Sequence, residues 1–156
     1  MKVRPVESDI DINTLLPGAQ FIDAYSITVN AALDARHAAE KMTAPGPRWI
    51  GMLLGLRNRL VAPLGLKTAA PSGISAPDRV GIFPVISETP GRLVAGLDDA
   101  HLDFRLVVDI AGSGTERRVT ATTLVLTHNL LGRTYLAIIL PFHRLIVPSM
   151  LRKVAS

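Results

Sequence analysis

Apolar and polar side chains alternate along five stretches of the chain, and each stretch predicts a half-buried β-strand. The first stretch, residues 20–29, is rich in β-branched and aromatic side chains. The other four follow one another closely, at residues 80–88, 92–98, 102–111 and 117–128. Their connections are short and carry turn residues such as Pro90 and Gly91, so the pattern predicts an antiparallel meander.

The strand at 102–111 has two unlike faces, because successive side chains point to opposite sides of a sheet. The apolar face is expected to meet a helix, and it carries Leu102, Phe104, Leu106, Val108 and Ile110. The opposite face is half polar, and it carries His101, Asp103, Arg105, Val107 and Asp109. The alternation leaves open whether this half-polar face meets solvent or lines a ligand cavity.

Three other segments predict helices, two of them by repeating apolar residues every three or four positions. The first is residues 31–42, which contain neither Gly nor Pro. The second starts after Pro47 and ends near residue 62. It places Trp49 on its buried face, where the indole packs in the core or, alternatively, stacks on a ligand. The third and longest helix covers residues 131–154.

The long helix presents two apolar faces. The first is expected to cover the sheet and consists of Leu131, Tyr135, Ile138, Phe142, Leu145 and Ile146. The second has no assigned partner and consists of Leu136, Leu140, Val147 and Leu151. Pro141 and Pro148 either curve the helix or, at Pro141, break it into two. Within this helix the longest uncharged run, 134–142, is well short of the roughly 20 residues that a membrane span needs, which argues against a span.

The order strand, helix, helix, four strands, helix predicts an α+β fold. We expect a single domain over residues 1–156, with an antiparallel sheet of five to seven strands gripped by the long C-terminal helix. Pro5 and the Pro17–Gly18 turn signal make residues 1–19 an irregular lead-in. Residues 67–79 read as a loop, and a sixth strand could lie within 66–76.

Composition narrows the classes of protein. Of the 156 residues, 48% are hydrophobic and 19% are charged, which excludes a disordered chain. There is no cysteine, which excludes disulfide frameworks, thiolate nucleophiles and zinc fingers. The N-terminal residues lack the apolar core of a secretory signal, so a cytoplasmic location is expected.

The net charge of +4 is unevenly distributed. Residues 41–77 and 117–156 contain basic but no acidic side chains, and both segments include apolar helices. This combination indicates either an anionic membrane surface as partner or amphipathic helices with solvated arginines. Aromatic residues make up only 4% and the basic residues are scattered, so we expect no nucleic-acid partner.

Several polar residues on the strands are candidates for a site. His128 closes the last strand, where it suits a general base at a cavity mouth or merely completes a turn that Asn129 caps. Glu88 is interpreted as a cross-strand partner of Arg92 or Arg105. Asp103 and Arg105 lie on the half-polar face, which is either a pocket wall or a solvated surface.

The long helix supplies further candidates. His143 and Arg144 lie between its two apolar faces, where Arg144 either holds an anionic head group or covers apolar surface with its stem. Tyr135 and Phe142 are expected to line a ligand pocket from the first face. Metal ligation is not expected, since the four histidines are scattered. No phosphate-binding glycine loop is present, and no cofactor is expected.

The chain resembles an uncharacterised bacterial family, catalogued as domain of unknown function 2867. The resemblance covers about residues 23–151, and its motifs ETP, THN, GRTY and LPFHR occur in the right order. The element order also resembles the helix-grip fold of the START/birch-pollen-allergen (SRPBCC) superfamily. That resemblance implies a hydrophobic cavity between a curved sheet and the C-terminal helix, and relatives that bind lipids, sterols or polyketides. A complete helix-grip fold has seven strands, whereas the alternating pattern of this sequence predicts five.

The first functional hypothesis is therefore a binding or carrier module for a small apolar molecule. A second is a membrane-surface or homodimeric interaction protein that uses the basic apolar helices. A third is a cyclase or dehydratase on the same scaffold, with His128, Glu88, Asp103 and Arg105 as its polar groups.

Overall fold

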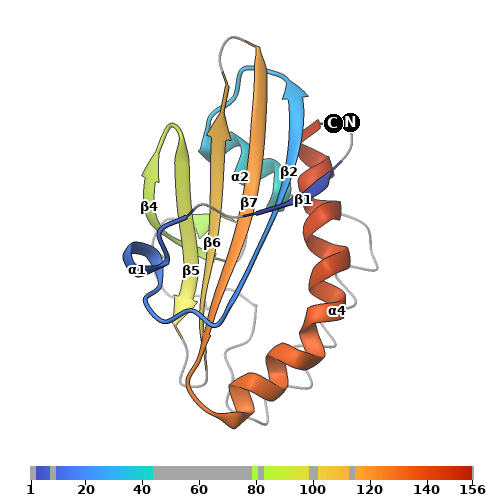
Figure 1. Ribbon diagram of the computed structural model, residues 1–156. Helices are drawn as coiled ribbons and strands as arrows, with labels where there is room; N and C mark the ends of the chain where they lie inside the picture. The colour runs from blue at the N-terminus through green and yellow to red at the C-terminus, as the bar shows by residue number, and fades with distance from the viewer. Residues whose placement is uncertain are drawn as a thin grey trace.

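The computed structural model describes residues 3–7, 10–43, 79–80, 83–98, 102–112 and 115–155 (Figure 1). Its strands are β1 (Arg4–Val6), β2 (Phe21–Asn30), β3 (Arg79–Val80), β4 (Phe83–Thr89), β5 (Arg92–Asp98), β6 (Leu102–Ala111) and β7 (Glu116–Thr127). Its helices are α1 (Ile12–Leu15), α2 (Ala35–Thr43) and α4 (Leu130–Arg152), followed by a 3₁₀ turn, η2 (Lys153–Ala155).

The seven strands form one antiparallel sheet in the order β1-β2-β7-β6-β5-β4-β3. The meander from β4 to β7 is as the sequence predicts, and β5 and β6 have the predicted bounds. The first long strand, β2, does not join the meander at its start but pairs with β7 along its whole length. Two short strands at the edges, β1 and β3, supply the strands that the alternation did not give.

One face of the sheet carries the main core. Leu106 and Val108 of β6 are buried there with Ile27 of β2, Met42 of α2 and Leu151 of α4. Phe104 and Ile110 pack against the same cluster, so the apolar face predicted for β6 is the one that meets the helices. Helices α2 and α4 both contact this face (Figure 1).

The opposite face is covered in part by the N-terminal segment. Val107, Leu124 and Val94 are buried there with Leu16, and Ile12 of α1 packs against them. The expectation of an irregular lead-in over residues 1–19 is therefore wrong. A strand of three residues and a helix of four are too short to show a period in the sequence, although Asp11 caps α1 by accepting a hydrogen bond from the N–H of Asn13 at 3.0 Å.

Helix α4 is continuous through Pro141 and Pro148, so the alternative of two helices broken at Pro141 is wrong. Each proline removes one backbone hydrogen bond, and the helix is visibly curved (Figure 1). The two apolar faces are exchanged relative to the prediction. Val147 and Leu151 of the second face are buried against the sheet, whereas Ile138 and Leu145 of the first are exposed.

Hydrophobicity alone could not rank these two faces, since both are apolar. The buried face also carries Gly132, and it continues into η2 through the buried Val154. It further carries His143, which finds a polar partner on β2. The helix predicted after Pro47 and the strand considered within 66–76 lie outside the described residues.

By length and composition alone, one described helix could cross a bilayer. It is Leu130–Ala155, with a mean hydropathy of 1.4 in its most apolar 18-residue window. A long apolar helix packed on a sheet passes the same test, and Val147, Leu151 and Val154 are packed in this way.

Candidate functional site

The helix-facing side of β2 carries one acidic residue, and α4 brings a histidine to it. His143 Nε2 lies 3.2 Å from Asp23 Oδ1 and 3.1 Å from Oδ2, and the side chains are only 16% and 21% exposed. The ring of Phe21 meets the imidazole edge to face, with ring centroids 5.9 Å apart. Because Nε2–H donates to the carboxylate, a neutral His143 keeps Nδ1 as a hydrogen-bond acceptor.

A buried hydroxyl lies beside this pair. Thr123 of β7 is the register partner of Asp23, so their side chains are neighbours on the helix-facing surface. Thr123 is 2% exposed, and its Oγ1 has no hydrogen-bond partner among the described residues. A buried polar atom without a partner costs about 1–3 kcal/mol, so such an atom calls for an explanation.

Tyr25 and Arg144 extend the same site. Burial, followed by the negative charge of Asp23, raises the pKa of Tyr25, while the positive charge of Arg144 lowers it. The phenol is therefore protonated at neutral pH and can donate a hydrogen bond. Asp23, Tyr25 and Thr123 from the sheet, with His143 and Arg144 from α4, are called the β2–α4 site below.

A hollow of about 470 Å³ opens at the sheet edge beside this site. It is lined by residues of β2, of β1 and of the segment just after β1: Pro5, Val6, Glu7, Ile22, Asp23, Ala24 and Tyr25. Small-molecule sites commonly have volumes of about 300–1,000 Å³. The hollow lies at the β1–β2 edge, rather than centrally between the sheet and α4 as the sequence suggested. A second hollow, of about 440 Å³, lies on α4.

The predicted strand candidates lie on the other face of the sheet. His128 Nε2 is 3.0 Å from Asp103 Oδ1, so these two candidates do meet. Arg105 donates to Asp98 Oδ1 at 2.6 Å. The register places Asp103 and Arg105 on the face of Val107, away from α4, so they are separate from the β2–α4 site.

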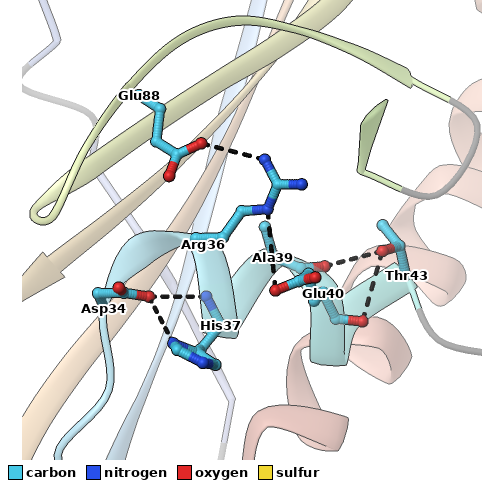
Figure 2. A network of polar contacts seen from close by, with 7 residues as sticks. All are labelled: Asp34, Arg36, His37, Ala39, Glu40, Thr43 and Glu88. Atoms are coloured by element: carbon cyan, nitrogen blue, oxygen red, sulfur yellow. Dashed lines mark hydrogen bonds and ion pairs between the residues drawn. The ribbon is translucent and has the colours of Figure 1, made fainter. Parts of the chain in front are cut away.

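Glu88 lies at a third location. Its Oε1 accepts a hydrogen bond from Arg36 Nη1 of α2 at 3.0 Å (Figure 2). The predicted pairing of Glu88 with Arg92 or Arg105 is wrong, because Arg92 pairs with Asp109 and Arg105 with Asp98. In the same network Asp34 caps α2 and holds His37 by its backbone N–H and its Nδ1 (Figure 2).

The remaining candidates are on α4 or outside the described part. Tyr135 is half-buried on α4, while Phe142 points to the exposed side. Trp49 and His101 lie outside the described residues. Within the residues that the structure places, no group of three acidic or histidine side chains could hold a metal ion.

Sequence reasoning missed Asp23, Tyr25 and Thr123, although it named His143 and Arg144. A usable signal was present for Asp23, because it is the one charged residue on the alternating face that includes Phe21, Tyr25 and Ile27. Thr123 offered no such signal, since threonine is common in strands and its missing partner is visible only in three dimensions.

The architecture defines an α+β protein in which one antiparallel sheet carries a long C-terminal helix. The model of the family described as "Protein of unknown function (DUF2867)" matches residues 15–150, and the chain belongs to this family. A conserved protein from Geobacillus kaustophilus is similar over 86% of this chain and 93% of its own, with 11% identity and a TM-score of 0.43. Comparison with curated proteins gives no match.

Proposed function

We propose that this protein binds a small apolar molecule that carries one hydrogen-bonding group, with that group held at the β2–α4 site. The observation that carries the proposal is the unpartnered hydroxyl of Thr123, buried next to the Asp23–His143 pair. A ligand hydroxyl or carbonyl supplies the missing partner and removes the cost of the orphaned atom.

The surroundings favour an apolar body for the ligand. Phe21 and Val125 flank the polar group in neighbouring register positions on the helix-facing side. The edge hollow is lined by the apolar Pro5, Val6 and Ile22 together with the polar Glu7, Asp23 and Tyr25, so it offers apolar side chains beside polar ones. Membership of the START-like helix-grip superfamily, which the element order resembles, is part of the same proposal.

Two matched probes test the proposal: 1-naphthol, and naphthalene, which lacks the hydroxyl. We expect 1-naphthol to bind more tightly, by about three- to tenfold, because one buried hydrogen bond contributes that much. Titration calorimetry or probe fluorescence measures both affinities. The preference should disappear in Thr123→Val and in Asp23→Asn.

Thr122→Val is the matched control. Thr122 is equally buried but lies on the opposite face of β7, so its removal should leave the preference for 1-naphthol intact. Equal affinity for the two probes, or no binding of either, contradicts the proposal. Native mass spectrometry of the purified protein tests it separately, since a copurified molecule should be lost from Thr123→Val but kept by Thr122→Val.

A further inference from the structure

The outward side of α4 exposes large apolar side chains. Ile138 is 60% exposed and Leu145 is 61% exposed, and Phe142 is also exposed. Spacings of four and three residues place these three on one side of the helix, away from the buried Val147 and Leu151. Single exposed apolar residues are ordinary on protein surfaces, whereas a contiguous stripe marks a contact surface.

Arginines border this stripe. Arg144 and Arg152 line the second hollow, of about 440 Å³, together with Leu145, Pro148 and Ser149. Neither arginine forms an ion pair with any residue that the structure describes. The sequence contains no acidic residue from position 117 onward, so nothing on α4 neutralises these charges. The outward side is therefore both apolar and positively charged.

We infer that the outward side of α4 docks on an anionic phospholipid bilayer, with the helix lying in the plane of the interface. Ile138, Phe142 and Leu145 enter the boundary between head groups and acyl chains. Arg144 and Arg152 bind phosphate oxygens through charge-assisted hydrogen bonds.

Two features favour docking on a bilayer surface over a membrane-spanning helix and over a symmetric dimer. A spanning helix would expose all of its sides to lipid, whereas Val147 and Leu151 are packed on the sheet and His143 is bonded to Asp23. A symmetric dimer through this side would bring the arginines of two copies together with no acidic residue of α4 to offset them. An anionic lipid surface complements both the positive charge and the apolar stripe on this side of α4.

Co-sedimentation with vesicles of phosphatidylcholine, with and without phosphatidylglycerol, tests the inference on the full chain. We expect binding only to vesicles that contain phosphatidylglycerol, and weaker binding at high salt because exposed charges are screened. The double substitution Ile138→Glu with Leu145→Glu should reduce binding by about tenfold or more. Arg152→Gln should reduce it by about fivefold.

Two control variants make the same chemical changes elsewhere. Ile86 of β4 is 52% exposed, and Ile86→Glu should leave vesicle binding unchanged. Arg118 of β7 is exposed at the end of the sheet, and Arg118→Gln should bind more tightly than Arg152→Gln. Circular dichroism and melting temperature confirm that each variant folds as the wild type does.

Absence of vesicle binding overturns the inference, as does equal binding to phosphatidylcholine alone or binding that survives Ile138→Glu with Leu145→Glu. A concentration-dependent dimer in light scattering that Ile138→Glu dissolves would assign the stripe to a second copy instead. The inference shares only Arg144 with the β2–α4 site, and none of the variants that test it changes that residue. The probe preference depends on Thr123, and vesicle binding depends on the other side of α4, so each can fail alone.

Discussion

Two histidine–aspartate pairs lie on opposite faces of one sheet, and their settings differ. His143 and Asp23 join a helix to a strand, and both side chains are mostly buried beside an orphaned hydroxyl. His128 and Asp103 lie at the ends of two adjacent strands, and His128 is 38% exposed. The distances are nearly identical and the two aspartates are about equally exposed, at 21% and 19%, so the exposure of the histidine distinguishes the candidate site from the other pair.

A third pair completes the series. His37 and Asp34 are 2.8 Å apart, yet His37 is 69% exposed and serves the cap of α2 (Figure 2). Since exposed ion pairs contribute about 0–1 kcal/mol, we expect the three pairs to rank in stability by burial rather than by distance.

The largest expected effect tests whether the C-terminal end of α4 holds the His143–Asp23 pair in position. Leu151→Ala and Leu124→Ala each remove a fully buried leucine, one on each face of the sheet. Each should lower the free energy of unfolding by about 2–5 kcal/mol, measured by urea denaturation. Only Leu151→Ala should also weaken binding of 1-naphthol, because only Leu151 anchors α4. Equal effects of both variants on binding would show that the two faces are not separate.

The next largest effect concerns the face of the sheet that is turned away from α4. Gly96 is buried in β5 opposite Arg105, and a Cβ there would collide with the backbone oxygen of Phe104. Gly96→Ala should therefore cost about 1–3 kcal/mol by the same measurement, through forced displacement of the backbone. Gly91→Ala is the matched control, because its Cβ would come no closer than 4.0 Å to Ile110 O.

Replacing His143 or His128 by leucine directly compares how much each His–Asp pair stabilises the fold. His143→Leu leaves a largely buried Asp23 without its partner and should cost about 1–3 kcal/mol. His128→Leu should cost about 0.5 kcal/mol, because His128 is 38% exposed and water can replace its imidazole beside Asp103. Urea denaturation of both variants decides the ranking. A larger cost for His128→Leu would mean that burial does not separate these pairs.

The last comparison concerns the capping pair of Asp34 and His37. Asp34→Ala should cost about 1 kcal/mol at neutral pH, because the side chain caps α2. The hydrogen bond from the His37 N–H lowers the pKa of Asp34, so its stabilising effect is complete above the unfolded-state pKa. It is lost as the pH falls through the lower, folded-state pKa. Asp34→Asn keeps the cap and should differ from wild type only in this acidic dependence, followed by thermal melts across pH.

The sequence predicted the regular parts of the fold well, because long periodic segments carry their own signal. Strand bounds at 92–98 and 102–111 are correct, and the helix at 131–154 differs from α4 and η2 by one residue at each end. The predicted membership of the uncharacterised family is confirmed. The sheet-facing side of α4 was misassigned, because two equally apolar faces differ only in partners that lie elsewhere in the chain.

The candidate site was less predictable for a related reason. Asp23 and His143 are separated by 120 positions, and no local pattern connects them. Glu88 was assigned a partner on a neighbouring strand. Its partner in the structure is Arg36, which lies on α2, far away in the sequence. Residue type identified groups able to do chemistry, but only the sheet order could decide which of them meet.

The position of β2 has a consequence for how the chain folds. During synthesis β2 emerges before β3, β4, β5 and β6, yet its main partner is β7, and Phe21 must find Val125. Pairings between such distant positions close slowly, and until then β2 presents unpaired backbone edges that can join another chain. Nascent chains of this protein should therefore depend on chaperones until β7 has emerged from the ribosome.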